Sequence, residues 1–257
     1  MGMLRRKLES GELALGSHVS LADSVITEIM GSAGFDYLWI DTEHAAIDLN
    51  ILEKHLIAAR AANVSAIVRV PWNDPVRIKP VLEMGPEGIV IPMVSTREQA
   101  EQAIRACLYP PRGIRGYGPR QAIRFGATSL EEYLKHAADA TLRFIQIEQI
   151  EAVRNLDDIL AVEGIDGIII GPCDLSASMG KIGEWDDPEV QRTIDLICER
   201  AHARKVKVGL SIGYLTPEQM RRWRDRGMDM ISQVSEVDFI YQGAKKLLED
   251  MRRAYLG

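Results

Sequence analysis

Ionisable side chains stand at the ends of several short apolar runs of this sequence. Asp41, Glu43 and His44 follow the run YLWI, Arg69 lies near the end of AIVRV, and Glu148 ends RFIQIE. A charge at the end of a buried segment is costly unless it has a partner or a ligand. These residue types at these positions therefore predict a functional site.

Two carboxylates and an arginine indicate the chemistry of that site. Glu148 and Asp174, the latter in GPCDLS, have no Cys or His ligand pattern beside them. They favour a hard-oxygen site for Mg²⁺, Mn²⁺ or Co²⁺, with water and substrate completing the octahedron. Arg69 can hold a substrate carboxylate or stabilise an enolate. His44 can shuttle a proton, and Asp41 is close enough in sequence to orient it.

Most of these residues also have a purely structural interpretation. Asp174 could cap a helix or lie in a solvated loop, and Asp41 could brace a turn. His44 could be a structural histidine. Cys173 has no base beside it in the sequence, so it is a weak candidate nucleophile. Arg69 is the hardest to explain structurally, because a charge inside AIVRVP needs a partner.

Other polar residues end predicted strands without an assigned role. Gln146, Ser211 and Gln233 are of this kind. His18 lies in the first predicted strand and is ambiguous between a pocket wall and the core. The remaining histidines fall on helical patterns, which predicts surface positions for His55, His136 and His202.

Two common kinds of cofactor chemistry are disfavoured. No lysine ends a predicted strand, which disfavours a Schiff-base mechanism; the nearest lysines are Lys54, Lys79 and Lys181. No G-x-G-x-x-G motif follows the first predicted strand and no Walker A motif occurs, so no nucleotide is expected.

The elements that must position these residues alternate between β-branched runs and amphipathic helical patterns. The candidate strands are 13–21, 37–41, 66–70, 88–94, 143–148, 167–171, 207–212 and 228–234. The candidate helices are about 22–33, 48–62, 75–84, 96–107, 151–162, 188–204, 217–226 and 238–254. Eight strand–helix units in one chain predict an α/β fold, the (β/α)8 TIM barrel. A doubly wound open sheet is the alternative.

The 257 residues are expected to form one domain, 1–257, because no linker or low-complexity tract interrupts them. The exception is a long loop insertion at about 109–142, which is rich in Gly, Pro and Arg and has one helical signal near 129–138. Long loops in compact domains are usually functional, so a lid or a subunit contact is expected there. Phosphate binding is the less favoured role for its arginines, Arg112, Arg115, Arg120 and Arg124.

Composition excludes several classes of protein. With 46% hydrophobic and 26% charged residues the chain is not expected to be disordered. A net charge of -6 without a basic run argues against nucleic acid or an anionic membrane as partner, and no apolar stretch is long enough to span a bilayer. The three widely spaced cysteines suit a reducing, cytoplasmic location.

Five segments of the chain together resemble a known family. They are GFDYLWIDTEHA (34–45), VRVPWNDPVRIKPVLEMG (68–85), YPPRGIRG (109–116), IQIEQ (145–149) and VEGIDGIIIGPCDLSASMG (162–180). In this order they resemble the class II, metal-dependent pyruvate aldolases of the HpcH/HpaI family, which include 4-hydroxy-2-oxoheptanedioate and 2-dehydro-3-deoxyglucarate aldolases. The resemblance covers nearly the whole chain.

The resemblance implies a barrel whose last helix is exchanged between subunits, in hexamers built as trimers of swapped dimers. It implies that Glu148 and Asp174 are the metal ligands, that Arg69 stabilises the pyruvate enolate, and that His44 with Asp41 is the acid/base. It further implies a substrate site formed by Gln146 and by the backbone of Gly171, Pro172 and Cys173, with Ser211 and His18 nearby.

Three positions depart from the family's pattern. His18 stands where members have Trp, and Cys173 where they have Ala or Ser. Glu83 stands where they usually have Asp, near metal-bound water, so Glu83 is a candidate for water-mediated metal contact. None of the three is a metal ligand, so the reaction class is unaffected, but the departures leave the identity of the aldehyde open.

The implied reaction is reversible cleavage of a 4-hydroxy-2-oxo acid to an aldehyde and pyruvate (or hydroxypyruvate) through an enolate stabilised by the metal and Arg69. Its partners are small molecules, a 2-oxo acid and an aldehyde. One alternative is other enolate chemistry, such as acyl-CoA cleavage or oxaloacetate decarboxylation. Another is a non-catalytic ligand-binding barrel, which the intact set of candidate residues disfavours.

Overall fold

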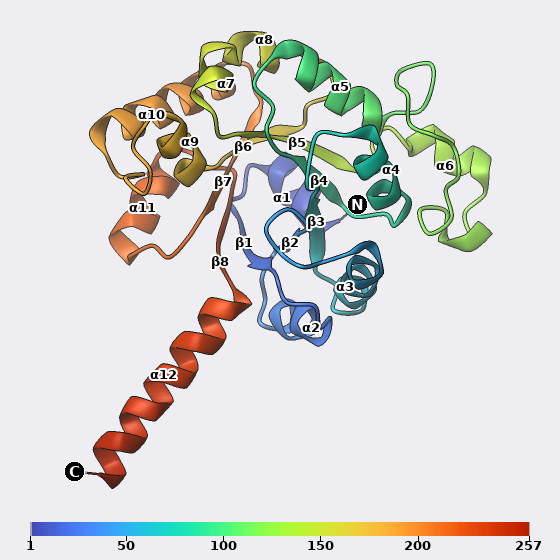
Figure 1. Cartoon of the computed structure of the whole chain (residues 1–257). Coiled ribbons are helices and arrows are strands. Elements are labelled where there is room, and N and C mark those ends of the chain that lie inside the picture. Colours follow the sequence, from blue (N-terminus) through green and yellow to red (C-terminus); the bar gives the residue numbers. More distant parts are fainter. Residues whose placement is uncertain (1, 257) are drawn as a thin grey trace.

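Eight parallel strands close into a barrel in this computed structural model, which describes residues 2–256 (Figure 1). Every neighbouring pair is parallel and β8 pairs with β1, so the predicted TIM barrel is confirmed and the open sheet is wrong. The strands are β1 (Ala14–Val19), β2 (Tyr37–Asp41), β3 (Ser65–Arg69), β4 (Gly88–Ile91), β5 (Leu142–Ile147), β6 (Gly167–Ile170), β7 (Lys207–Ile212) and β8 (Met230–Ser235).

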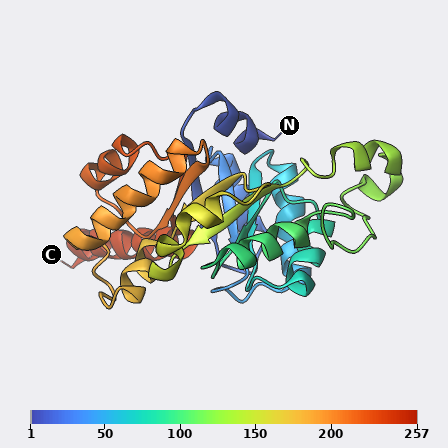
Figure 2. The same ribbon diagram turned by 90° about the horizontal axis from the view of Figure 1, so that it is seen from above.

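Helices follow the strands and surround the barrel (Figures 1 and 2). They are α1 (Met3–Ser10), α2 (Val25–Ser32), α3 (Leu49–Ala61), α4 (Pro75–Glu83), α5 (Arg97–Cys107), α6 (Leu130–His136), α7 (Ile150–Arg154), α8 (Leu156–Leu160), α9 (Pro172–Ser178), α10 (Pro188–Ala203), α11 (Pro217–Asp225) and α12 (Glu236–Tyr255), with a 3₁₀ turn, η1 (Arg124–Gly126). The predicted helix at 151–162 is two short helices. The helices α1 and α9 were not predicted.

Alternate residues of each strand point into the barrel, which determines what reaches its mouth. In β2, Tyr37 and Trp39 are fully buried in the interior cluster, and Asp41 is the next residue of the same parity. A Cβ on Gly16 of β1 would lie 2.5 Å from the Tyr37 ring, so only glycine fits there. The large side chains fill the barrel interior toward α1, and the polar residues lie at the carboxyl ends of the strands.

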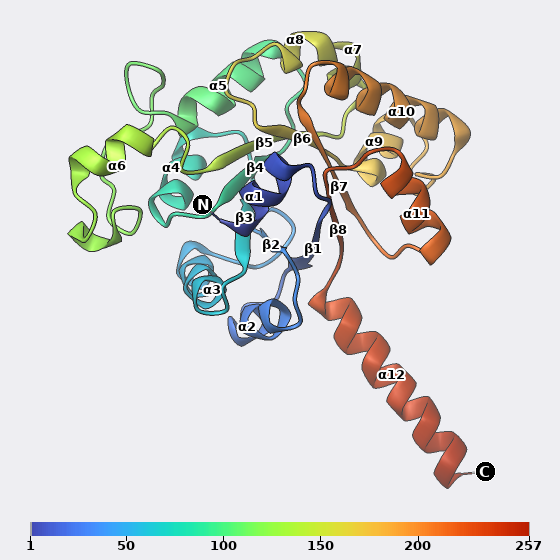
Figure 3. The same cartoon turned by 180° about the vertical axis from the view of Figure 1, so that it is seen from behind.

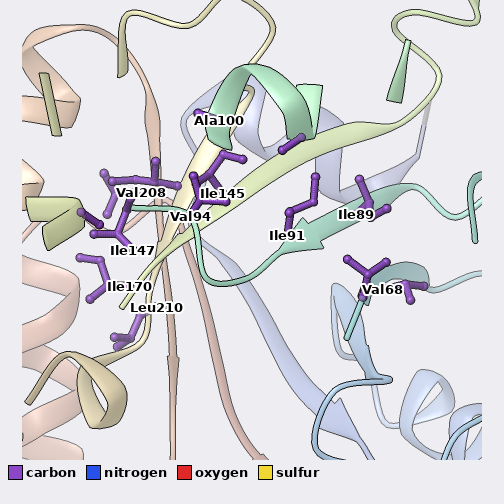
Figure 4. Close-up of a cluster of buried hydrophobic side chains, with 14 of the residues drawn as sticks. Val68, Ile89, Ile91, Val94, Ala100, Ile145, Ile147, Ile170, Val208 and Leu210 are labelled. Carbon is purple, nitrogen blue, oxygen red and sulfur yellow. The ribbon is translucent and has the colours of Figure 1, made fainter. Parts of the chain in front are cut away.

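The other face of the strands packs against the helices. Figure 4 shows this apolar layer, which is buried throughout and includes Val68, Ile89, Ile91, Ile145, Ile147, Ile170, Val208 and Leu210. Strands buried on both faces give the continuous apolar runs seen in the sequence. The barrel is therefore a rigid frame for the residues at its mouth.

The helix α1 closes the opposite end of the barrel. Leu4 and Leu8 are buried in the same cluster as Tyr37 and Phe144. The N–H of Leu4 donates to the Ser65 hydroxyl at 3.0 Å. With its lower end covered, the barrel is open to substrate at the carboxyl ends of its strands.

The segment 109–141 does not cover that open end. It projects at one side of the barrel (light green in Figures 1 and 2), and Arg115 in it pairs with Glu83, the last residue of α4, at 2.9 Å. The C-terminus of α4 lies toward the amino ends of the strands, because the chain enters β4 from there. The expected role of this segment, a lid or a subunit contact, stays a prediction.

Of the three histidines predicted to lie on the surface, His55 is buried, so that prediction is wrong for His55. His55 lies on the inner face of α3, with its Nδ1 2.7 Å from the Thr27 hydroxyl of α2. The hydroxyl satisfies a ring nitrogen, which makes burial tolerable. Helical periodicity alone did not distinguish the inner face from the outer one here.

The last helix, α12, extends away from the barrel (Figures 1 and 3). Its exposed apolar residues include Ile240, Leu247, Leu248 and Met251. Between residues 2 and 256, no helix is both long and apolar enough to cross a bilayer.

Candidate active site

A cavity of about 330 Å³ opens at the carboxyl ends of the strands. Seven of the eight strands, or the segments that follow them, contribute to its lining: His18, Ser20, Asp41, His44, Arg69, Gln146, Gly171, Cys173, Asp174, Ser211, Ile212, Gly213, Val234, Ser235 and Asp238. The structure thus brings together at one cavity most of the residues predicted for the site.

Arg69 is held by two acids, the last residue of the neighbouring strand β2 and one in the segment that follows it. Its Nε donates to Asp41 Oδ1 at 3.0 Å and its Nη2 to Asp41 Oδ2. Its Nη1 lies 3.0 Å from Glu43 Oε2. These contacts raise the pKa of Arg69 against the effect of burial. The guanidinium is therefore a fixed positive charge at the mouth.

The expected pairing of Asp41 with the His44 ring is not what the structure shows. The two Asp41 oxygens accept from Arg69, and Oδ1 also accepts the backbone N–H groups of Glu43 (3.0 Å) and His44 (3.3 Å). Despite burial, these donors lower the pKa of Asp41. The His44 Nε2 lies 3.8 Å from Glu43 Oε2, and its side chain is 66% exposed. Glu43, not Asp41, is the acid near the imidazole.

Glu148 is a buried carboxyl at the end of β5. Its Oε1 accepts the N–H of Met93 at 2.7 Å, and its Oε2 contacts the Gln146 amide. Burial is the first cause that raises its pKa to about 7, and the charges of Glu43 and Asp174 add to it. Met93 holds a positive φ of 57°, an uncommon conformation for a side-chain-bearing residue.

Asp174 completes this acidic side of the mouth from the first turn of α9. Its charge, added to the effect of burial, raises the pKa of Glu43 and of Glu148, while Arg69 is the cation that lowers both. A divalent cation would relieve that repulsion, so the donor set fits a hard metal ion.

The fit requires ligands from outside the chain. Across residues 2–256, no group of three or more His, Cys, Asp or Glu side chains is arranged to hold an ion. Two carboxylates leave most of an octahedron open, and water or substrate oxygens would fill it.

Gly171 leaves room beside these groups. A Cβ there would lie 3.1 Å from Gln146 Nε2 and 3.3 Å from Glu148 Cβ. Gln146 Oε1 is buried without a hydrogen-bond partner, so a polar ligand in this space would satisfy it. Pro172 is buried at the start of α9, and the Cys173 side chain is exposed beside the cavity.

His18 forms the opposite wall with two serines. Its Nε2 lies 3.1 Å from both the Ser211 hydroxyl of β7 and the Ser232 hydroxyl of β8. Its ring meets Trp39 edge-on with centroids 5.3 Å apart. Burial, assisted by the Arg69 charge, lowers the pKa of His18 to about 4. His18 therefore lines the cavity as a neutral imidazole, which resolves the ambiguity between wall and core.

Glu83 does not reach this cavity within the chain. It ends α4, where its Oε1 accepts from Nε and Nη2 of Arg115. Arg115 in turn stacks on the Tyr109 ring at 4.5 Å. The sequence predicts a water-mediated metal contact for Glu83. Within one chain the structure does not place it for that contact, because the carboxyl end of α4 lies away from the mouth of the barrel.

Three residues of the site were given no role from the sequence. In the sequence, Glu43 is one of several polar residues after a strand. It lies close to Arg69 because β2 pairs with β3. Ser232 and Met93 carried no signal: one is a small residue inside an apolar strand, and the other acts through its backbone.

Comparison with known proteins gives relatives of the same length and fold. The HpcH/HpaI aldolase/citrate lyase family matches residues 15–239. The chain is 37% identical to a hydroxypyruvate/pyruvate aldolase of Roseovarius nubinhibens over 95% of each chain. It is 35% identical to a 5-keto-4-deoxy-D-glucarate aldolase of Escherichia coli O157:H7, over 96% of this chain and 95% of the relative.

A crystal structure of an HpcH/HpaI aldolase from Desulfitobacterium hafniense superposes with a TM-score of 0.91 at 30% identity, covering 98% of this chain and 97% of that one. The match in sequence, residues 15–239, includes Asp41, Arg69, Glu148 and Asp174. The chain therefore belongs to the HpcH/HpaI aldolase/citrate lyase family, and it is an enzyme of the aldolase type.

Proposed function

We propose that this protein is a divalent-metal-dependent aldolase that reversibly cleaves 4-hydroxy-2-oxo acids to an aldehyde and pyruvate or hydroxypyruvate. The observation that carries the proposal is that Asp174 and Arg69 line one cavity, and that both charges act on the pKa of the buried Glu148 beside it. The names of the two aldolase relatives support this substrate class.

Glu148 and Asp174 would hold the ion, which is Mg²⁺, Mn²⁺ or Co²⁺ by the preference of carboxylate oxygens. When bound, such an ion supplies Lewis acidity toward a 2-oxo group. The space beside Gly171 would accept the 2-oxo acid, close to the Gln146 amide and the start of α9.

Arg69 would stabilise the charge that develops as the carbon–carbon bond breaks. Its guanidinium is oriented by Asp41 and Glu43 before substrate arrives, so little reorganisation is needed during the reaction. When the C3–C4 bond breaks, the electron pair stays on the three-carbon fragment as an enolate. Protonation of its C3 then gives pyruvate.

His44 would accept the proton of the 4-hydroxyl group, directly or through water, as the aldehyde forms. Its imidazole is exposed at the rim and has Glu43 as the nearby acid. An imidazole is suited to accept and return a proton near neutral pH. Asp41 would act on Arg69 and on the backbone of His44 only.

His18 and Ser211 would contact the aldehyde portion of the substrate. They form a polar part of the cavity wall in which His18 is a neutral imidazole. A wall of this kind suits hydroxylated aldehydes better than apolar ones, because a neutral imidazole and a hydroxyl can exchange hydrogen bonds with hydroxyl groups.

We further propose that the chain is a homo-oligomer in which α12 is exchanged between subunits, in hexamers built from swapped dimers. In a TIM barrel the helix after the eighth strand covers β8 and β1, but here α12 leaves them (Figure 1). Leu15, Val25 and Ile29 near that uncovered position are exposed, and the apolar residues of a partner's α12 would cover them.

The three cysteines are free, which supports a reducing, cytoplasmic location.

The decisive experiment is metal removal and replacement. Cleavage of a 4-hydroxy-2-oxo acid, followed as pyruvate release, should disappear in EDTA and return with Mg²⁺, Mn²⁺ or Co²⁺. Full activity in the chelated enzyme would exclude the metal role.

Oxaloacetate decarboxylation is the second candidate, because the family description includes citrate lyases and the same cavity could stabilise the same enolate. Comparing kcat/KM for oxaloacetate with that for an aldol substrate distinguishes the two. An at least tenfold preference for the aldol substrate is expected for an aldolase (about 1.4 kcal/mol in transition-state binding).

A further inference from the structure

Glu236 is a buried acid at the root of α12 that the reaction above does not use. It is the first residue of the helix and is only 1% exposed. Within residues 2–256 it forms no ion pair with Lys, Arg or His, and its Oε2 has no hydrogen-bond partner. A buried carboxylate without a paired cation is costly, so other contacts must stabilise Glu236.

The other oxygen of Glu236 holds the segment that follows β1. Oε1 accepts the backbone N–H of Ser20 at 2.7 Å and that of Leu21, and it lies 3.3 Å from the Ser20 hydroxyl. Several N–H and O–H donors on one oxygen, together with the positive end of the α12 dipole, offset part of the cost of burying the charge.

This segment and the root of α12 are both parts of the cavity wall. Ser20 lines the cavity two residues after His18, and Ser235 and Asp238 line it on either side of Glu236 in sequence. The Glu236 carboxyl therefore joins two neighbouring rims of the mouth, one after β1 and one after β8.

A second contact lies below the first. The Ser17 hydroxyl is 3.0 Å from the carbonyl oxygen of Gln233 and 3.1 Å from that of Val234. Here the β1–β8 register shifts between Ser17 and His18, and Val234 has a positive φ of 43°. The strand ends are thus irregular, and ordinary sheet pairing does not fix the rim by itself.

Helix capping does not account for Glu236. The carboxyl of Asp238 already accepts the N–H of Ser235 at 2.9 Å at the start of α12. Glu236 instead points across to a different segment, more than 200 residues away in sequence.

We propose that Glu236 is a positioning residue: it fixes the rim that carries His18 and Ser20 to the first turn of α12, so that the shape of the substrate cavity depends on how α12 is anchored. The inference rests on the proposed function, in which His18 faces the substrate. It also links that cavity to assembly, because α12 is the helix that leaves the barrel and stacks Phe239 on Phe35, with ring centroids 6.4 Å apart.

The test compares Glu236→Ala and Glu236→Gln with Glu249→Ala, an exposed acid further along α12 that serves as the control. The full-length Mn²⁺-loaded proteins are used. Pyruvate affinity is measured by calorimetry, kcat and KM by pyruvate release, and oligomer mass by light scattering. Hydrogen exchange at the amides of Ser20 and Leu21 reports their hydrogen bonds to Glu236 directly, and this measurement does not depend on enzyme activity.

In Glu236→Ala we expect the pyruvate Kd and the KM to rise about tenfold, the effect of losing a charge-assisted hydrogen bond, with faster exchange at Ser20 and Leu21. The kcat should stay within about threefold, because the groups that move the proton and hold the charge are untouched. Glu236→Gln should be much milder, since its amide oxygen still accepts. Glu249→Ala should match the wild type.

Wild-type KM and Kd in a folded Glu236→Ala, with only a lower Tm, would show a merely structural role and overturn the proposal. Unchanged amide exchange at Ser20 and Leu21 would also overturn it, whatever reaction the enzyme performs. If Glu236→Ala does not fold, Glu236→Asp, one methylene too short to reach, must show the same rise in KM. Pyruvate binding without aldol cleavage in the wild type would count against the proposed function alone.

Discussion

Arg69 and Asp41 meet side by side as paired residues of β3 and β2. The strands place the two in register, and Arg69 Nε donates to Asp41 Oδ1 at 3.0 Å while Nη2 donates to Oδ2. The planar fork of arginine makes this two-point contact possible, and a lysine could make only one of the two. The orientation of the Arg69 guanidinium is therefore set by the pairing of the two strands.

Replacing Arg69 with Lys should lower kcat about 10²–10³-fold, because the charge remains but its position relative to the enolate is lost. Metal affinity should change little, since Arg69 is not a ligand. Arg97→Lys is the control: Arg97 also pairs with an acid, Glu101, but on the surface, and its replacement should leave kcat unchanged. Wild-type kcat in Arg69→Lys would refute the role.

His44→Ala should lower kcat about 10²–10³-fold while Mn²⁺ still binds, as expected for the loss of a general base. His136 provides a matched control. It too is an exposed histidine beside a glutamate, with Nε2 3.5 Å from Glu132, but it lies on α6 away from the cavity. If His44→Ala were as active as His136→Ala, His44 would not be needed for the reaction, and another group would have to move the proton.

Glu148→Gln and Asp174→Asn should each weaken Mn²⁺ binding by at least tenfold, which calorimetry can measure directly. The reason is that a neutral amide replaces one of only two charged donors. Glu199→Gln, an exposed position on α10, should bind Mn²⁺ as the wild type does. Undiminished binding in Glu148→Gln would place the ion elsewhere.

Most of this site follows from two features of the sequence. Strands buried on both faces give apolar runs, and alternate residues of a run share one face. Once Trp39 is placed in the interior, Asp41 is placed with it. The same parity takes Phe144 to Gln146, so the residues at the mouth are predictable once the barrel is recognised.

Partner choice at the mouth was not predictable from one strand alone. Asp41 is near His44 in sequence, but its carboxylate pairs with Arg69, because the next strand places that residue directly opposite. Glu83 is the last residue of α4, the helix that follows the strand of Arg69. This helix returns the chain to the end of the barrel opposite the mouth. The short helices α1 and α9 have too few apolar positions to show a period.

Acid should destabilise the metal-free protein partly through His18. Burial lowers its pKa to about 4 in the folded chain, below the ordinary value of 6.5. Between these values the unfolded chain binds a proton that the folded chain does not, so stability falls as pH falls through this range. Urea unfolding at pH 4.5 to 7.5 should therefore show a shallower dependence in His18→Gln. Identical slopes in the two proteins would mean that His18 is charged when folded.

Assembly through α12 should depend on its apolar face. Leu248 is 47% exposed on a helix that leaves its own barrel, and neighbouring apolar residues extend that face. An isolated apolar face of this size in water is unfavourable, so a second copy is expected to cover it. Leu248→Asp should lower the mass measured by light scattering at micromolar concentration, since it would bury a charge in the contact.

Leu134→Asp provides the comparison, because Leu134 on α6 has a similar exposure, 45%, and belongs to a different surface. If α12 is the element exchanged between subunits, Leu248→Asp should disrupt the dimer, whereas Leu134→Asp should leave at least dimers intact. A wild type that is already monomeric, or a Leu248→Asp protein with the mass of the wild type, would exclude exchange of α12. We expect disruption of the dimer, because α12 extends away from β1 and α2 of its own barrel in Figures 1 and 3.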